Sequence, residues 1–169
     1  MSILMLFVLS CKQDHKKGSS LNKSIMAYPS YVQNVLDAHG GLSLWQSMGA
    51  IKYEIEKEGG NEKQFINLSD RREKIIASDF TMGYDGTNYW MEADTSVKTD
   101  PIFYKNLMFY FYAMPFVLAD EGIIYEEVDP LNFEGETYLG FKVSYKADVG
   151  ASPEDEYFLY YDQQTKEMA

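Results

Sequence analysis

A repeat of two residues, in which apolar and polar side chains alternate, limits the fold of this chain more than any other feature. In residues 51–56 three apolar side chains alternate with Lys and Glu, and residues 141–146 repeat the pattern with Lys, Ser and Lys. Successive side chains of a strand point to opposite faces, so this pattern predicts strands with one buried and one wet face. Other strand-forming segments bring the expected number to about eight; they include residues 65–68, 74–78, 123–128 and 157–161.

Short turns join the expected strands. Asp85-Gly86 lies between aromatic residues and predicts a hairpin, because the central residues of tight hairpin turns need positive φ. Residues 133–136 form a second turn region. Successive strands joined in this way form an antiparallel meander, which curls because sheets twist. Aromatic residues make up 15% of the chain, which also favours strands. We therefore expect a mainly β (α+β) fold, with a curled antiparallel sheet or incomplete β-barrel.

Two helical regions interrupt the strands. The first begins near Pro29 and ends at Gly40-Gly41, and a short helical turn follows in residues 42–48. The second begins at Asp100-Pro101, with Asp as N-cap. Residues 102–118 are almost all apolar or aromatic, so this helix is expected to be buried on nearly every side. Because it is too short to span a bilayer, we expect it to cover the concave face of the sheet.

The amino terminus has the pattern of a bacterial lipoprotein signal. Residues 3–9 form an apolar run of the length found in secretory signals, and Val8-Leu9-Ser10-Cys11 resembles the lipobox. The resemblance implies cleavage before Cys11 and attachment of lipid to that residue. The alternative is a cytosolic protein whose first strand is residues 3–9. No Lys or Arg lies in residues 1–9, so the leader is expected to be incomplete.

The chain is thus divided into a signal peptide (1–10), a lipidated flexible tether (11–24) and a half-barrel domain (25–169). Four Lys and no apolar periodicity mark the tether. By resemblance to lipoprotein sorting, Lys12 implies an outer-membrane lipoprotein of the cell envelope, facing the periplasm or the surface. Membrane lipid is the expected partner, through an acylated Cys11. The domain ends at Ala169, where a partner strand should begin, so closing strands are expected to be missing.

Composition and motifs exclude several functions. A net charge of −11 argues against a nucleic acid partner. One Cys and two His exclude an internal disulfide and argue against a zinc site. The acidic residues in 126–129 and 148–156 are interpreted as solvated, and no nucleophile, phosphate-binding or metalloprotease motif occurs. Lys105 is the only lysine in a clearly apolar stretch. We expect no enzyme activity, no cofactor and no metal.

The order of these motifs resembles the bacterial periplasmic lipoprotein-carrier family, whose fold is an incomplete antiparallel barrel lidded by helices. The matching features are Cys11, His39-Gly40-Gly41 with Trp45 after it, and residues 84–90 and 160–166. The chain looks closer still to a set of bacterial lipoproteins for which the resemblance implies no activity.

The resemblance to the carrier family implies a non-catalytic carrier that binds an acyl chain or a lipoprotein in the half-barrel. The candidate cavity residues are bulky and apolar: Trp90, Phe103, Met108, Phe109, Phe111 and Met114. Such side chains more often fill a core than line a pocket. The alternative is therefore an interaction lipoprotein with a filled core, which binds a protein partner on its acidic outer face.

Overall fold

The structure, a computed structural model, describes residues 28–147, 149 and 154–169. The predicted signal peptide, the tether and the acylated Cys11 lie outside the described residues, as does most of the loop at 148–153.

The chain is mainly β, as the alternating pattern predicts. In order, its elements are α1 (Ser30–Ala38), α2 (Leu42–Ser47), β1 (Ala50–Ile55), β2 (Glu62–Asn67), β3 (Glu73–Ile76), β4 (Phe80–Tyr84), β5 (Tyr89–Ala93), α3 (Pro101–Tyr112), the 3-10 helix η1 (Phe116–Ala119), β6 (Ile123–Phe133), β7 (Glu136–Tyr145) and β8 (Tyr157–Asp162).

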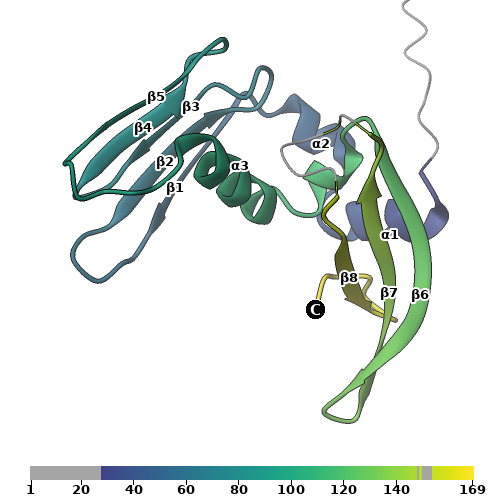
Figure 1. Cartoon of the computed structure of the whole chain (residues 1–169). Coiled ribbons are helices and arrows are strands. Elements are labelled where there is room, and N and C mark those ends of the chain that lie inside the picture. Colours follow the sequence, from purple (N-terminus) through teal and green to yellow (C-terminus); the bar gives the residue numbers. More distant parts are fainter. Residues whose placement is uncertain (1–27, 148, 150–153) are drawn as a thin grey trace, which may run out of the picture.

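The strands form two antiparallel sheets where the strand order predicts one continuous meander. One sheet has the order β1-β2-β3-β4-β5 and the other β6-β7-β8. The segment between β5 and β6 is occupied by α3 and η1, so these two strands do not pair. Helix α3 lies between the two sheets, and α1 lies beside the β6–β8 sheet (Figure 1).

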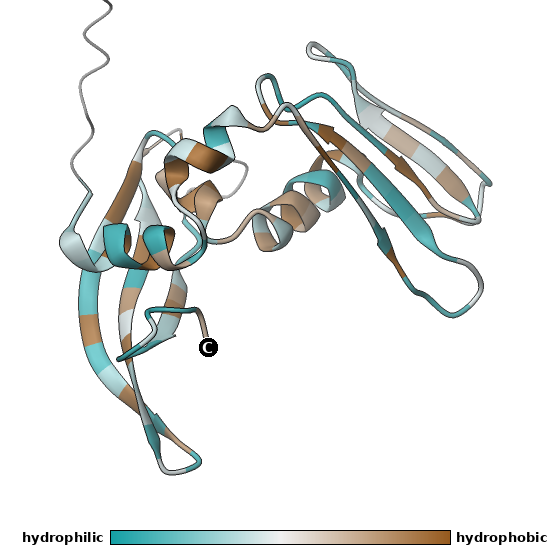
Figure 2. Ribbon diagram, turned by 180° about the vertical axis from the view of Figure 1, so that it is seen from behind, coloured by the Kyte–Doolittle hydropathy of each residue, from teal (hydrophilic) through white to brown (hydrophobic). Residues whose placement is uncertain are grey.

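The apolar core joins α1, η1 and the β6–β8 sheet. Val32, Val35 and Leu36 form the buried stripe of α1, as their helical spacing predicts. They share one cluster with Phe141 of β7 and Leu118 of η1, both fully buried. Figure 2 shows apolar positions interrupting the hydrophilic stretches of these strands. Strand alternation therefore places the core on one face of the sheet.

Helix α3 begins as the sequence predicts. The Asp100 carboxylate accepts hydrogen bonds from the backbone N–H groups of Ile102 at 2.8 Å and Phe103 at 3.2 Å. The prediction that nearly every side of α3 is buried is wrong: Phe103 and Phe111 are each 56% exposed. The reason is that the helix contacts the β1–β5 sheet with one side, while its remaining surface faces a cavity and solvent.

The hairpin predicted at Asp85-Gly86 joins β4 and β5, and Tyr84 pairs with Tyr89 across it. Its loop has four residues, and only Gly86 among them has positive φ, at 104°. The Asp85 carboxylate accepts the backbone N–H groups of Thr87 and Asn88, both at 2.8 Å. The side chain of Asp85 therefore stabilises a longer loop than a two-residue turn.

Candidate ligand cavity

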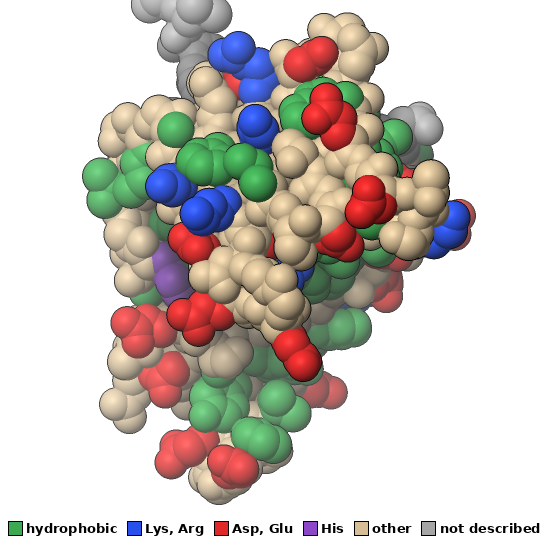
Figure 3. Space-filling model, turned by 90° about the vertical axis from the view of Figure 1, so that its left-hand side faces the viewer, with side chains coloured by type: hydrophobic (Ala, Val, Ile, Leu, Met, Phe, Trp, Pro, Cys, Tyr) green, Lys and Arg blue, Asp and Glu red, His purple; other side chains and the backbone are tan. Residues whose placement is uncertain are grey.

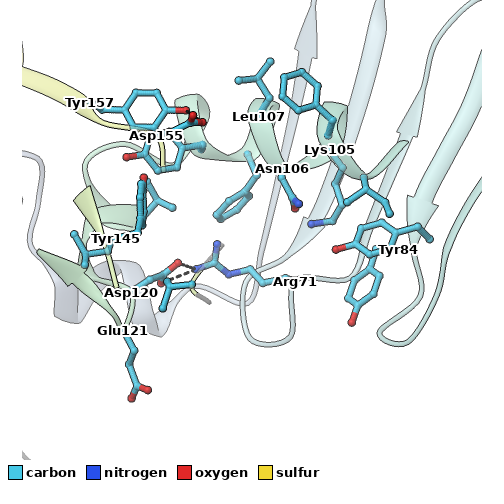
Figure 4. A pocket seen from close by; sticks show the side chains of 18 residues that line it. Arg71, Tyr84, Lys105, Asn106, Leu107, Asp120, Glu121, Tyr145, Asp155 and Tyr157 are labelled. Carbon is cyan, nitrogen blue, oxygen red and sulfur yellow. Dashed lines mark hydrogen bonds and ion pairs between the residues drawn. The ribbon is translucent and has the colours of Figure 1, made fainter. Parts of the chain in front are cut away.

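A cavity of about 650 Å³ opens between α3 and the two sheets (Figure 4). Its walls come from the β2–β3 turn, the β4–β5 hairpin, α3, η1, the start of β6, the end of β7 and the start of β8. Apolar and aromatic side chains form most of the lining; they are Tyr84, Tyr89, Ile102, Phe103, Leu107, Phe109, Tyr110, Val117, Ile123, Tyr145, Val149 and Tyr157. The polar residues are Arg71, Lys105, Asn106, Asp120, Glu121 and Asp155.

Arg71 connects the two halves of the molecule at the bottom of this cavity. Its guanidinium donates from one nitrogen to both carboxylate oxygens of Asp120, at 2.9 and 3.0 Å. The same guanidinium lies 4.1 Å from the centre of the Phe109 ring. Arg71 has φ of 61°, because the tight β2–β3 turn needs a left-handed residue there. The turn thus directs a cation from the first sheet toward the start of the second.

Lys105 is a buried cation on the cavity wall. Its ammonium lies 3.3 Å from Glu73 Oε2, and the two side chains are 6% and 0% exposed. Within the described residues, neither carboxylate oxygen of Glu73 has a hydrogen-bond partner. Burial raises the pKa of Glu73 from 4.5 to about 7, and the attraction of Lys105 opposes this rise only in part. The pair is therefore incompletely satisfied.

A second buried carboxylate, Glu62, has the opposite environment. Its oxygens accept hydrogen bonds from Lys57 at 2.6 Å, from the Tyr104 hydroxyl at 2.7 Å and from the Gln64 amide. Gln64 in turn accepts a hydrogen bond from the Tyr53 hydroxyl. This network holds α3 on the β1–β5 sheet through Tyr104, but it does not line the cavity.

Three tyrosines close the opposite end of the cavity. The Tyr110 ring centre lies 4.8 Å from that of Tyr157 and 6.4 Å from that of Tyr145. Burial raises the pKa of the Tyr110 and Tyr145 hydroxyls. The Tyr157 hydroxyl donates to Asp155 at 3.3 Å. These rings pack against one another, so this end forms a closed aromatic wall rather than a cage.

The structure brings two of the six predicted cavity residues into the lining, Phe103 and Phe109. Met108, Phe111 and Met114 belong to the same part of the chain but do not line the cavity. Met114 packs against the apolar core, and Phe111 is exposed.

Trp90 lies on the opposite face of the β1–β5 sheet from Tyr89 and the cavity, since neighbours in a strand alternate. A Cβ atom built on Gly83, its partner across the strands, would come within 2.9 Å of the Trp90 ring. Gly83 therefore leaves the space in which the indole packs. Trp90 also lines a shallower depression of about 530 Å³ on that outer face.

Sequence reasoning singled out Lys105 as the lysine in an apolar stretch, and the structure places it in the wall. It did not find Arg71 or Glu73. The polar residues Glu62 and Gln64 alternate with Lys63 and Phe65, a pattern that does not reveal which set faces inward. Only contact with α3 decides this.

The acidic residues of β6 are exposed, as the sequence predicts, whereas Asp148 of the second acidic cluster lies outside the described residues. Glu126, Glu127 and Asp129 are exposed on β6. In the described part of the chain, no group of three His, Cys, Asp or Glu side chains could hold a metal ion. No helix among the described residues is long and apolar enough to cross a membrane.

Comparison with known proteins gives a family but not an activity. No curated protein matches the chain. The family described as "Family of unknown function (DUF6503)" matches residues 60–169, which include β2 to β8, α3 and every residue that lines the cavity. Because this match covers well over half of the 169 residues, the chain belongs to that family.

Proposed function

We propose that the protein is a membrane-anchored lipoprotein that binds an apolar ligand without catalysing a reaction. The ligand would be an acyl chain or the acylated part of a lipoprotein, and the two sheets would act as parts of one incomplete barrel. The observation that carries this proposal is the cavity of about 650 Å³ with mostly apolar and aromatic walls. Pockets for single small ligands have volumes of roughly 300–1,000 Å³ and similar walls.

The energetics of transfer favour such a ligand. Each CH₂ group moved from water to an apolar site contributes about 0.8 kcal/mol. Phe103 is 56% exposed at the cavity edge, so it has apolar surface that a bound chain would cover. Substitution of Phe103 should therefore weaken binding of an apolar ligand.

Binding can be tested with the neutral fluorescent probe N-phenyl-1-naphthylamine and the whole protein. We expect saturable binding with about one site per chain. Phe103→Ala should weaken it roughly tenfold, because about 1–2 kcal/mol of apolar contact is lost. The matched control is Phe111→Ala: the same change on the same helix, in a side chain of equal exposure outside the cavity. A linear signal, or equal effects of both variants, would contradict the proposal.

The anchor is supported by the sequence at Cys11, with Ser10 before it and an apolar run before that. Mass spectrometry of the protein expressed in bacteria should show the mass of attached acyl chains, and Cys11→Ala should lack it. Equal acyl content in the two proteins would refute lipidation at this residue. This test is independent of the cavity.

An interaction lipoprotein is the second candidate, favoured by exposed aromatic side chains on α3. Phe111 and Tyr112 are 56% and 47% exposed. On the face shown in Figure 3, acidic and basic side chains both lie among apolar ones, a surface suited to a protein with complementary charges. A non-saturating probe signal, together with loss of a partner in Phe111→Ala, would favour this function.

A further inference from the structure

We propose that the ligand of the cavity is an anionic amphiphile, whose head group binds between Lys105 and Arg71 while its apolar chain lies along Phe103 and Phe109. This inference rests on the proposed function, because it needs the cavity to bind a ligand. It adds the charge and the orientation of that ligand.

Lys105 is only loosely paired. Its ammonium is buried, and the only carboxylate within ion-pair distance among the described residues is Glu73 at 3.3 Å. That distance is long beside the 2.6 Å between Lys57 and Glu62. Burial of a charge is costly unless the charge is paired and hydrogen-bonded. The ammonium also lies 5.6 Å from the centre of the Tyr84 ring. An anionic group in the cavity would give Lys105 an acceptor in addition to Glu73.

Arg71 has N–H donors that its pairing with Asp120 does not use. A guanidinium has five N–H donors, and only the two on Nη2 donate to Asp120. The other three find no acceptor within the described part of the chain. Arginine suits carboxylate and phosphate groups, because its donors match pairs of anionic oxygens.

The polar side chains of the lining are unevenly distributed along the cavity. Figure 4 shows the side chains of Lys105 and Asn106 directed from α3 toward the space that holds the Arg71 guanidinium. Glu121 is directed away from this space, and Asp155 lies beside Tyr157 at the opposite end. At the end that holds Lys105, Asn106 and Arg71, the carboxylate of Asp120 is already paired with Arg71. The donors that remain there favour an anion at this end rather than beside Asp155.

Apolar surface lies next to the donors of Arg71 and Lys105. Phe109 contacts the Arg71 guanidinium directly. Phe109 also follows Lys105 by four positions on α3, so the two share one side of the helix, and Phe103 lines the same cavity. Charged and apolar groups side by side in one cavity fit a ligand that combines both, such as a fatty acid or an alkyl phosphate.

The test is competition against bound N-phenyl-1-naphthylamine near pH 8, where a carboxylic acid is ionised. The competitors are hexadecanoic acid, hexadecyl phosphate and the neutral hexadecan-1-ol, all below their aggregation limits. We expect both anions to displace the probe at concentrations roughly tenfold or more below that of the alcohol. A preference between acid and phosphate identifies the head group.

Variants assign the preference to residues. Lys105→Met and Arg71→Asn should bring the acid and the alcohol toward equal potency while probe binding continues, and Lys105→Arg should keep the preference. Asn is chosen at Arg71 because it tolerates the left-handed backbone. Glu73→Gln should strengthen binding of the acid but not of the alcohol, because it removes the carboxylate that competes for Lys105. A purely structural role of Glu73 would not produce this gain.

Equal potency of acid and alcohol in the parent protein would overturn the inference and leave the proposed function intact. Absence of saturable probe binding would overturn both. If Lys105→Met fails to fold, the double variant Glu73→Gln/Lys105→Met removes both charges of the pair. A persistent preference for the acid in that double variant and in Arg71→Asn would also overturn the inference.

Discussion

The two sheets bury different kinds of side chain. The β6–β8 sheet buries Phe141, Val143, Leu159 and Tyr161 against α1 and η1. The β1–β5 sheet also buries apolar residues, but the described residues that are both buried and polar or charged all gather at its contact with α3: Glu62, Gln64, Glu73 and Lys105.

The two sheets are therefore held to their helices in different ways, one by apolar contacts and the other partly by charged ones. Apolar contacts are non-directional and do not depend on pH. Charged contacts depend on partners and on protonation, so the contact between α3 and the β1–β5 sheet is the part of the fold that responds to pH and to charged ligands. Loss of an apolar residue should therefore lower the free energy of unfolding equally at every pH, whereas loss of a charge should lower it by an amount that depends on pH.

The largest effect is expected in the apolar half. Phe141→Ala removes a fully buried ring that packs against Tyr31, Tyr125 and Tyr161. The free energy of unfolding, measured with urea, should fall by about 3–5 kcal/mol at any pH near neutrality. Phe158→Ala is the matched control, because Phe158 lies on β8 with its ring 56% exposed, and it should cost less than about 1 kcal/mol. A small effect of Phe141→Ala would remove the contrast between the sheets.

A pH-dependent effect is expected in the charged half. Lys105→Met leaves Glu73 buried without a cation, so this carboxyl has to stay protonated, and the free energy of unfolding should fall by about 1.4 kcal/mol near pH 8, one pH unit above the pKa in the parent protein. Near pH 5 most of this loss should vanish. The pKa of Glu73 is raised to about 7, so the folded protein already holds this carboxyl protonated and neutral at pH 5. Urea unfolding at both pH values measures the difference.

Glu73 also sets the direction in which the stability of the parent protein changes with pH. Between pH 4.5 and 7 the folded state binds a proton that the unfolded state has lost, so stability falls as pH rises through this window. The contribution of Glu73 is about 3 kcal/mol, fully present below pH 4.5 and lost above pH 7. Glu73→Gln/Lys105→Met should flatten this part of the curve. An unchanged slope would show that other groups cause it.

The smallest effect is expected at the start of α3. Asp100→Ala removes the hydrogen bonds to the N–H groups of Ile102 and Phe103 and should cost about 1 kcal/mol. Amide hydrogen exchange should become faster in α3 and stay unchanged in the β6–β8 sheet. Asp85→Ala, which removes similar hydrogen bonds from the β4–β5 loop, should leave exchange in α3 unchanged. Equally faster exchange in both sheets would indicate a single cooperative unit.

Local sequence signals predicted many of the elements. The strands expected at residues 123–128 and 157–161 are present, and Asp100 caps α3. The strand expected at residues 123–128 stops five residues before the end of β6. The strand continues to Phe133 through an irregular register after Val128. An edge strand tolerates a proline there, since its outer N–H groups need no partner.

The cavity was predictable only in part. The apolar stretch around Lys105 indicated an unusual lysine, and the aromatic residues of α3 included Phe103 and Phe109. The partners of the two cations could not be read from the chain: Arg71 reaches Asp120 across 49 positions, and Lys105 reaches Glu73 from another element. Neither spacing follows a helical or strand period.

The sequence alone determined the alternation of strands, the turns and the helix starts, because each depends on side chains that are near in the chain. The tertiary structure decided that the strands separate into two sheets, that Glu73 and Lys105 are buried, and that only part of α3 lines a cavity. These outcomes depend on which distant segments meet, and burial of a charge is tolerated only where a partner from another element is present.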